Sequence, residues 1–300
     1  LRSVARAGGV DPACFEGLAF LSPPCQGVTS AGRHQPSDPR NALLMTLVEA
    51  ARDFPRAWLA MENVPGLLSP RNAPVLSGLL GGLASQGRAV PPAGELADAC
   101  VLDAADLGVP QVRRRVFLVV PPLGAREPFR VSSSGAFLRA RRSAHTLRAA
   151  IGPGSGFVDP DPRFKQFRDA EALVFRIPGH PWANRCREAM ALRYKQPESK
   201  FLRVLAWDEP ARTLTGVKVN LCRVSMVHPT GSRFLTIGEM MRVMGLPLGL
   251  GPMHGTVEGC WAMLADGICP AAAEVVGRAV MEAAGVSSRG REVAEVARRT

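Results

Sequence analysis

Short apolar runs alternate with periodic segments along the first 120 residues of this sequence. Runs of four or five apolar residues predict buried strands over Leu18–Leu21, Ala57–Met61 and Val116–Val120. Helices are predicted between them, from Pro39 onward and over 73–86. This order of strands and helices is typical of an α/β fold, and we expect a mainly parallel, Rossmann-like sheet.

Capping signals mark the starts of two helices. Asp38 directly precedes Pro39, a pair that favours the first turn of a helix. Thr236 and Glu239 have the spacing of a capping box, and the helix that they open should end at Gly245. A last helix is predicted over about 270–284. Between 123 and 208 the periodicity is weak and Arg, Gly, Pro and Ser are frequent, which indicates a second, irregular domain.

The charge of the chain favours a polyanionic partner. Lys and Arg number 37 against 26 Asp and Glu, a formal net charge of +11 over 300 residues. The surplus is uneven, because 126–148 holds six arginines and a single acidic residue. An arginine-rich proteome with a merely solvated surface is the alternative explanation.

Other sequence signals favour a cytoplasmic protein without a metal. No apolar run approaches the roughly 20 residues that span a bilayer, and no signal peptide is recognisable. The seven cysteines are scattered without a Cys-x-x-Cys pair, so neither a zinc site nor a disulfide framework is predicted. Histidines show no His-Glu-x-x-His spacing. The chain begins with Leu1, so a missing N-terminal piece is an open alternative.

Three polar clusters lie at the ends of the predicted strands. Cys25 follows two prolines, Glu62-Asn63-Val64 follows the second strand, and Gln111 to Arg115 precede the third. Neighbouring strands would bring the three clusters to one edge of the sheet, where open α/β proteins carry their chemistry. Alone, each has a plainer explanation: a buried thiol, a surface carboxylate or a solvated strand edge.

Together the three clusters suit the addition of a thiolate to a ring carbon next to a ring nitrogen. The charge that builds on the ring must be neutralised, which a carboxylic acid bonded to the ring nitrogen can do. An arginine at the ring or at the carboxylate would complete the electrostatics. Cys25 is then the nucleophile, with Glu62 and alternate arginines as its partners.

These motifs resemble those of the cytosine-5 DNA methyltransferases, in the same order from about residue 17 to 284. Three segments carry the chemistry: Pro23-Pro24-Cys25-Gln26-Gly27, Met61-Glu62-Asn63-Val64-Pro65-Gly66 and Asp106-Leu-Gly-Val-Pro-Gln111-Val-Arg113-Arg114-Arg115. Three later segments match the family's region around target recognition and its last motif: Asp208–Thr215, Arg233–Pro247 and Leu264–Val280.

The resemblance implies methylation of carbon 5 of a cytosine flipped out of double-stranded DNA, with S-adenosylmethionine as cofactor. Cys25 would attack carbon 6, Glu62 would bind ring nitrogen 3, and Arg113 and Arg115 would assist. The implied substrate-binding residues are Gln26, Asn63, Gln111, Thr213 and Thr215, and the implied cofactor-binding residues are Pro24, Asp266 and Ile268. A monomer with a role in restriction-modification or another DNA methylation system is expected.

The resemblance also divides the chain and shows departures from the family. It implies a partial catalytic domain over 1–122, a target-recognition domain over 123–247 and a C-terminal segment, 248–300, that returns to the catalytic domain. The family's N-terminal strands and glycine-rich cofactor loop are not recognisable, and Asp266 stands where the family has asparagine. An inactive DNA-binding remnant is therefore the main alternative. Methylation of RNA ranks lower, because no Cys-Phe-Thr element is found in the second domain.

Overall fold

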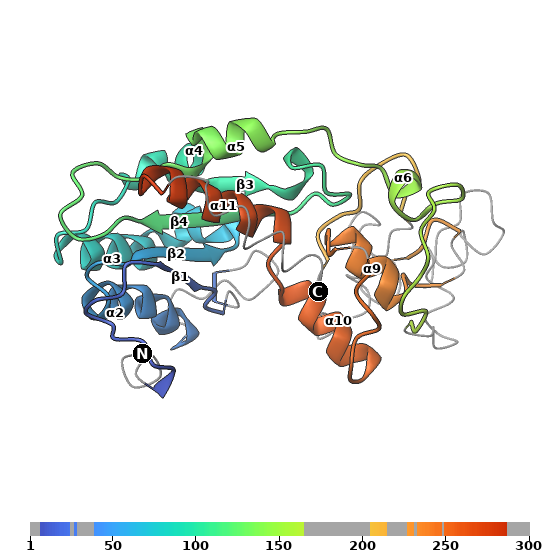
Figure 1. Cartoon of the computed structure of the whole chain (residues 1–300), viewed down its shortest axis with the longest axis horizontal. Coiled ribbons are helices and arrows are strands. Elements are labelled where there is room, and N and C mark those ends of the chain that lie inside the picture. Colours follow the sequence, from blue (N-terminus) through green and yellow to red (C-terminus); the bar gives the residue numbers. More distant parts are fainter. Residues whose placement is uncertain are drawn as a thin grey trace. The chain divides into compact units, whose positions relative to one another are not determined.

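The computed structural model describes residues 7–24, 27–28, 39–164, 205–214, 227–230, 233–247 and 249–286 (Figure 1). The chain forms two compact units. Unit 1 comprises 1–102, 114–141 and 273–300, and unit 2 comprises 103–113 and 142–272. Each unit therefore contains segments that are far apart in sequence. The predicted boundaries at 122 and 247 do not coincide with these limits, and the assignment of catalytic and target-recognition roles to them stays a prediction.

A four-stranded sheet with the order β1-β2-β4-β3 organises unit 1. Its strands are β1 Leu18–Leu21, β2 Trp58–Asn63, β3 Val101–Asp103 and β4 Arg114–Val120. All three predicted strands are present. β2 and most of β4 are buried as predicted, but β1 is only half-buried and its Phe20 is 37% exposed, which corrects the prediction for that strand. β1 runs parallel to β2, with Leu21 beside Met61, whereas β2 runs antiparallel to β4, with Glu62 beside Phe117.

The sheet is mixed, which corrects the prediction of a mainly parallel sheet. β4 follows β3 after a connection of only 104–113, too short for the helical crossover that joins parallel neighbours. The sequence showed β4 as an apolar run, and such a run carries no information about strand direction.

Helices pack on the sheet of unit 1. The residues that fill its main core come from α2 Thr46–Asp53, α3 Ala73–Ala84 and α4 Leu96–Cys100, packed against β2 and β4. In Figure 1, α2 is drawn below β1, α5 Gly135–Ala140 above β3, and α11 Pro270–Ala283 across β3 and β4. Val275, Val276, Ala279 and Val280 of α11 are buried, as their spacing predicts.

The helix predicted from Pro39 begins as a 3₁₀ helix, Pro39–Met45, and becomes α-helical at Thr46. A 3₁₀ helix has three residues per turn and an α-helix 3.6, so different positions face the core in the two kinds of helix. Here Leu44 is fully buried and Leu43 is 42% exposed. The predicted cap, Asp38, lies outside the described residues. Other 3₁₀ helices are Pro65–Leu68, Pro70–Asn72, Ala93–Glu95, Ala104–Asp106 and Val131–Ser133.

Unit 2 has a separate core made by α6 Leu147–Ile151, α9 Ile237–Val243 and α10 Val257–Asp266. The capping box of α9 is confirmed, and Gly245 follows the helix with a φ of +75°, a conformation that favours glycine. Helix α6 lies in the stretch predicted to be irregular, and five residues are too few to show a period.

The segment Val257–Ala283 is long and apolar enough to cross a membrane by length and composition alone, although charged residues interrupt its apolar positions. In the structure this segment contains two helices, α10 and α11, with 267–269 between them. Trp261 of α10 and Val276 of α11 are at most 1% exposed. Core helices of folded domains meet the same criterion, so the segment is weak support for a membrane span.

Candidate active site

The sheet places Glu62 on its central pair of strands. β2 lies between β1 and β4, and Glu62 is its next-to-last residue. Directly opposite on β4 is Phe117, whose ring meets that of Phe20 edge-on with centroids 6.2 Å apart. Because paired residues of adjacent strands share a face, the carboxylate lies on the same face as these aromatic rings.

The two carboxylate oxygens of Glu62 have different partners. Arg115 Nε lies 2.9 Å from Oε1, and Ser22 Oγ donates to Oε2 at 2.8 Å. The side chains of Glu62 and Arg115 are only 8% and 14% exposed. Arg115 Nη1 donates at 2.8 Å to the carbonyl of Arg114, which fixes the guanidinium plane. The predicted pairing of an acid with Arg115 is therefore present, between two largely buried side chains.

The loop that carries Cys25 is held on both sides. Asn63 Nδ2 donates to the carbonyl of Pro23 at 3.2 Å, and Asn72 Nδ2 donates to that of Val28 at 3.3 Å. Cys25 itself, with Gln26, lies outside the described residues. Asn63, which is 1% exposed, also accepts a hydrogen bond from the backbone of Val64. Its amide thus joins the Cys25 loop to the segment after Glu62.

Gly27 leaves no room for a side chain. A Cβ at this position would lie 2.0 Å from Asn41 Oδ1. Gly27 and Asn41 are both buried, so the 3₁₀ helix after the loop packs directly on the loop backbone. This close packing constrains the exit of the Cys25 loop.

Gln111 is fully buried in unit 2. Its amide nitrogen donates to the carbonyl of Val243 at 3.2 Å, and its oxygen accepts from the amide of Leu214 at 3.2 Å. The predicted substrate contact would need this amide, which here joins the segment 103–113 to α9 and to 205–214. Thr213 Oγ1 likewise donates to the carbonyl of Val112 at 2.8 Å, and Thr215 lies outside the described residues.

Arg113 also serves unit 2. Its Nη2 donates to the carbonyls of Ala265 at 2.8 Å and Gly267 at 2.7 Å, and the residue is 2% exposed. The alternation Arg113-x-Arg115 therefore sends two arginines to different units, where the sequence analysis had placed both beside the substrate. The carbonyls that Arg113 holds flank Asp266, an exposed residue, and precede Ile268, a half-buried one.

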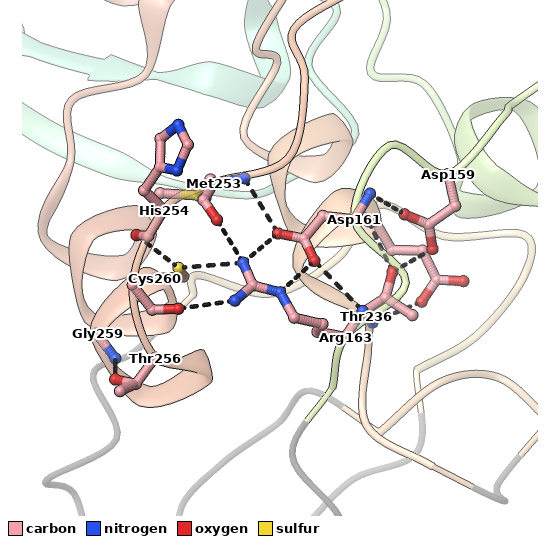
Figure 2. Close-up of polar contacts among 11 residues, drawn as sticks. Asp159, Asp161, Arg163, Thr236, Met253, His254, Thr256, Gly259 and Cys260 are labelled. Carbon is pink, nitrogen blue, oxygen red and sulfur yellow. Dashed lines mark hydrogen bonds and ion pairs between the residues drawn. The ribbon is translucent and has the colours of Figure 1, made fainter.

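A polar cluster that the sequence did not reveal holds the segment 159–163 of unit 2 (Figure 2). Asp161, with a side chain 1% exposed, pairs with Arg163 through Nε at 2.8 Å and Nη2 at 2.7 Å. Asp161 also accepts from the backbone of Met253 at 3.1 Å, and Arg163 Nη1 donates to the carbonyl of Gly255 at 2.7 Å. The Arg163 guanidinium lowers the pKa of Asp161 below its usual value. Only the spacing Asp-x-Arg could have indicated this pair.

A second buried cluster supports α9. Arg233 pairs with Glu239 through two hydrogen bonds of 2.7 and 2.8 Å, and His228 Nε2 lies 3.5 Å from the same carboxylate. Burial raises the pKa of Glu239, but the bonds from Arg233 and from the Thr236 amide outweigh it and leave the pKa below its usual value. Burial lowers the pKa of His228. The carboxylate thus stays ionised and closes the capping box.

Three of the four described cysteines are not set up as nucleophiles. Burial raises the pKa of Cys100 to about 12 and raises that of Cys269. The exposed thiol of Cys14 has a pKa raised by its hydrogen bond to Asp11. A catalytic thiol needs the opposite shift, so these residues do not compete with Cys25 for the role. Within the described residues, no group of three or more His, Cys, Asp and Glu could hold a metal ion.

Residues 15–134 match the family model of the C-5 cytosine-specific DNA methylases. Two type II methyltransferases are similar over larger parts of the chain. M1.BsuMI of Bacillus subtilis is 35% identical over 235 residues, which are 76% of this chain and 52% of that protein. M.MthTI of Methanothermobacter thermautotrophicus is 28% identical over 217 residues, 72% of this chain and 57% of that protein. The chain thus matches about half the length of these relatives.

Solved structures share the fold at low identity. The Entamoeba histolytica methyltransferase EhMeth has a TM-score of 0.53 at 12% identity, with 93% of this chain and 79% of that chain covered. The Schizosaccharomyces pombe Dnmt2 methyltransferase has a TM-score of 0.52 at 14% identity, with 88% and 77% covered. The Glu62–Arg115 pair, the anchored Cys25 loop and the matches from residue 15 to 134 agree, and the chain belongs to the C-5 cytosine-specific DNA methylase family.

Proposed function

We propose that this chain carries the catalytic centre of a DNA cytosine-5 methyltransferase that acts on double-stranded DNA through a covalent Cys25 adduct. The observation that carries the proposal is the buried Glu62 carboxyl, held by Arg115 and Ser22, next to a loop that is anchored on both sides of Cys25. A remnant that only binds DNA would need neither this acid nor its enclosure.

The chemistry assigns one task to each group. The Cys25 thiol loses its proton to water, and its thiolate bonds to carbon 6 of a flipped cytosine while the protonated Glu62 gives a proton to ring nitrogen 3, so the added electron pair moves to carbon 5. After carbon 5 is methylated, a base takes its proton, the bond to sulfur breaks, and Glu62 recovers its proton from nitrogen 3. Arg115 fixes the carboxyl and stabilises charge at the base.

The described residues fit part of a site for S-adenosylmethionine. Arg113 fixes the backbone at Ala265 and Gly267, which holds the exposed Asp266 and the half-buried Ile268 in a defined turn. A carboxylate beside an apolar side chain suits a ligand with a cationic sulfonium and ammonium. When bound, S-adenosylmethionine supplies the methyl group that carbon 5 takes up. With Gln111, Arg113 acts here as a positioning residue.

Sequence recognition is proposed for the region 123–247. The network around Arg163 and the pair Arg233–Glu239 hold two described segments inside this region, which give it a fixed base. Phosphate contacts near Thr213 and Thr215 would fix the register, and side chains of the variable segment would contact base edges. Restriction-modification is the setting that the type II relatives favour.

Trapping of the covalent adduct tests the proposal. A DNA duplex with 5-fluorocytosine at the target should form a stable adduct with the native-length protein in the presence of S-adenosylmethionine, since fluorine at carbon 5 blocks the final proton removal. Cys25→Ser should abolish the adduct, whereas Cys14→Ser, a change at an exposed cysteine outside the loop, should leave it unchanged. Methylation by Cys25→Ser would refute the mechanism.

Calorimetry separates the enzyme from an inactive remnant. The enzyme should bind S-adenosylmethionine with a saturable heat, and a remnant should bind DNA alone. DNA binding without cofactor binding and without an adduct would favour the remnant.

A further inference from the structure

The register of the parallel strands places Ser22 beside Glu62. Leu18 pairs with Trp58 and Leu21 with Met61. The residues that follow these pairs, Ser22 and Glu62, are therefore neighbours on the same face. The hydrogen bond from Ser22 Oγ to Glu62 Oε2 at 2.8 Å follows directly from this register. Ser22 is not among the site residues expected from the sequence.

Ser22 and Arg115 differ in what they can do for a carboxyl group. A guanidinium can only donate hydrogen bonds. Arg115 therefore makes the same contact with Oε1, which accepts, whether the carboxyl group of Glu62 is ionised or neutral. A hydroxyl both donates and accepts, so Ser22 can donate to an ionised Oε2 or accept from a protonated one by rotating about its C–O bond. The acid in the proposed reaction must pass through both states.

The surroundings leave Oε2 few other ways of being held. The carboxylate is 8% exposed, and the face beneath it carries the Phe20 and Phe117 rings, which offer no hydrogen bond to an oxygen. Without the hydroxyl, Oε2 would depend on an ordered water or turn away from the base. Loss of a partner for a buried charged group costs more than loss of an exposed bond.

We propose that Ser22 is a positioning residue for catalysis, which holds Glu62 Oε2 in place in both protonation states. The inference rests on the proposed function, because it names the group that orients the proposed acid. Ser22 itself touches neither the pyrimidine nor the methyl donor in this proposal.

Single-turnover kinetics on target DNA test this role. Ser22→Ala should slow methyl transfer about tenfold or more, with the KM values for DNA and cofactor changed less than twofold. Ser22→Thr keeps a hydroxyl and should stay within about threefold of the unmodified protein. Ser85→Ala, which removes an exposed hydroxyl bonded to the Gly82 carbonyl, is the matched control and should have no effect. In a Glu62→Gln background, Ser22→Ala should cause little further loss, because the two residues act as one unit.

Two results would overturn the inference while the proposed function stands: a Ser22→Ala rate within twofold of the unmodified protein, or a loss that is equally large in the Glu62→Gln background. If the unmodified protein transfers no methyl group, the proposed function fails. Crystal structures of the unmodified protein and of Ser22→Ala then test whether Ser22 holds the Glu62 carboxyl in place. A Glu62 carboxyl that rotates in Ser22→Ala supports the positioning role, and one that keeps its place refutes it.

Discussion

At the scale of single residues, the site depends on side chains that bind backbone more than on side chains that bind substrate. Asn63 and Asn72 each give an amide hydrogen to a carbonyl of the Cys25 loop, and Arg115 gives one to its own neighbour. Such bonds cost little entropy when the loop is already stiffened by Pro23 and Pro24. The reactive groups can therefore be few, because the surrounding residues hold them in place.

Gly27 gives a residue-scale prediction. Gly27→Ala should lower the single-turnover rate of methylation by about tenfold or more, because the new Cβ would lie 2.0 Å from Asn41 Oδ1 and the loop must move. The fold should persist, since Asn41 offers the end of a side chain and not backbone. Circular dichroism and methylation kinetics measure the two effects.

A paired change controls for this clash. Asn41→Ala removes the obstructing oxygen, so Gly27→Ala with Asn41→Ala should recover part of the rate lost by Gly27→Ala alone. Equal rates for the single and the double variant would show that space at Gly27 is not what holds the loop.

Sequence alone could identify Glu62 and Arg115, because each lies at the end of an apolar run that predicts a strand. It could not separate Arg113 from Arg115, because alternate residues of a strand share a face and both side chains were therefore expected at the same site. In the structure β4 begins at Arg114, so Arg113 precedes the strand and follows the path of unit 2. Ser22 needed the register of β1 on β2, which no single strand contains.

At the scale of elements, the clearest signals were local ones. The capping box at Thr236 and the start of α11 at Pro270 follow from residues within one turn, and both were predicted correctly. The direction of β4, by contrast, depends on β3, a strand of three residues that is too short to show a period. The sequence thus failed where the direction or existence of an element depends on the strand beside it, as for β3 and β4.

The Asp161–Arg163 pair gives an element-scale prediction about pH. Because Arg163 lowers the pKa of Asp161 in the folded chain, the pair stabilises unit 2 at pH values above the unfolded pKa of about 3.9, and this stability is lost as the pH falls through the folded pKa. Asp161→Asn should lower the free energy of unfolding at pH 7 by roughly 1–3 kcal/mol. Its stability should also fall less steeply than that of the unmodified protein below about pH 4.

Asp208→Asn is the matched control for that change. Asp208 also pairs with an arginine, Arg148, and its pKa is lowered by the same kind of bond, but its side chain is 78% exposed. Exposed pairs contribute little to stability, so thermal unfolding at pH 7 should hardly change. Equal losses for the two variants would contradict the view that burial makes the Asp161 pair important.

At the scale of the whole molecule, the chain combines two cores with a single path that passes between them more than once. Residues 103–113 leave unit 1 after β3 and return to it at β4. Composition could bound the number of domains, but it could not find these crossings, because they follow from packing of segments far apart in sequence. The net charge of +11, by contrast, can be calculated from the sequence without knowledge of the fold, and it favours a polyanionic partner.

Salt dependence of DNA binding tests that charge. The logarithm of the affinity for a DNA duplex should fall linearly with the logarithm of the salt concentration, with a slope of about −0.9 for each phosphate contact. Arg212 is exposed and precedes Thr213, which the family resemblance places near the DNA backbone, so Arg212→Gln should make the slope less steep by about one. Arg278→Gln removes an equal charge on α11 that is paired with Glu274, and it should leave the slope unchanged. A slope near zero would mean that the positive surplus only solvates the surface, and equal changes in both variants would mean that charge acts without a defined binding face.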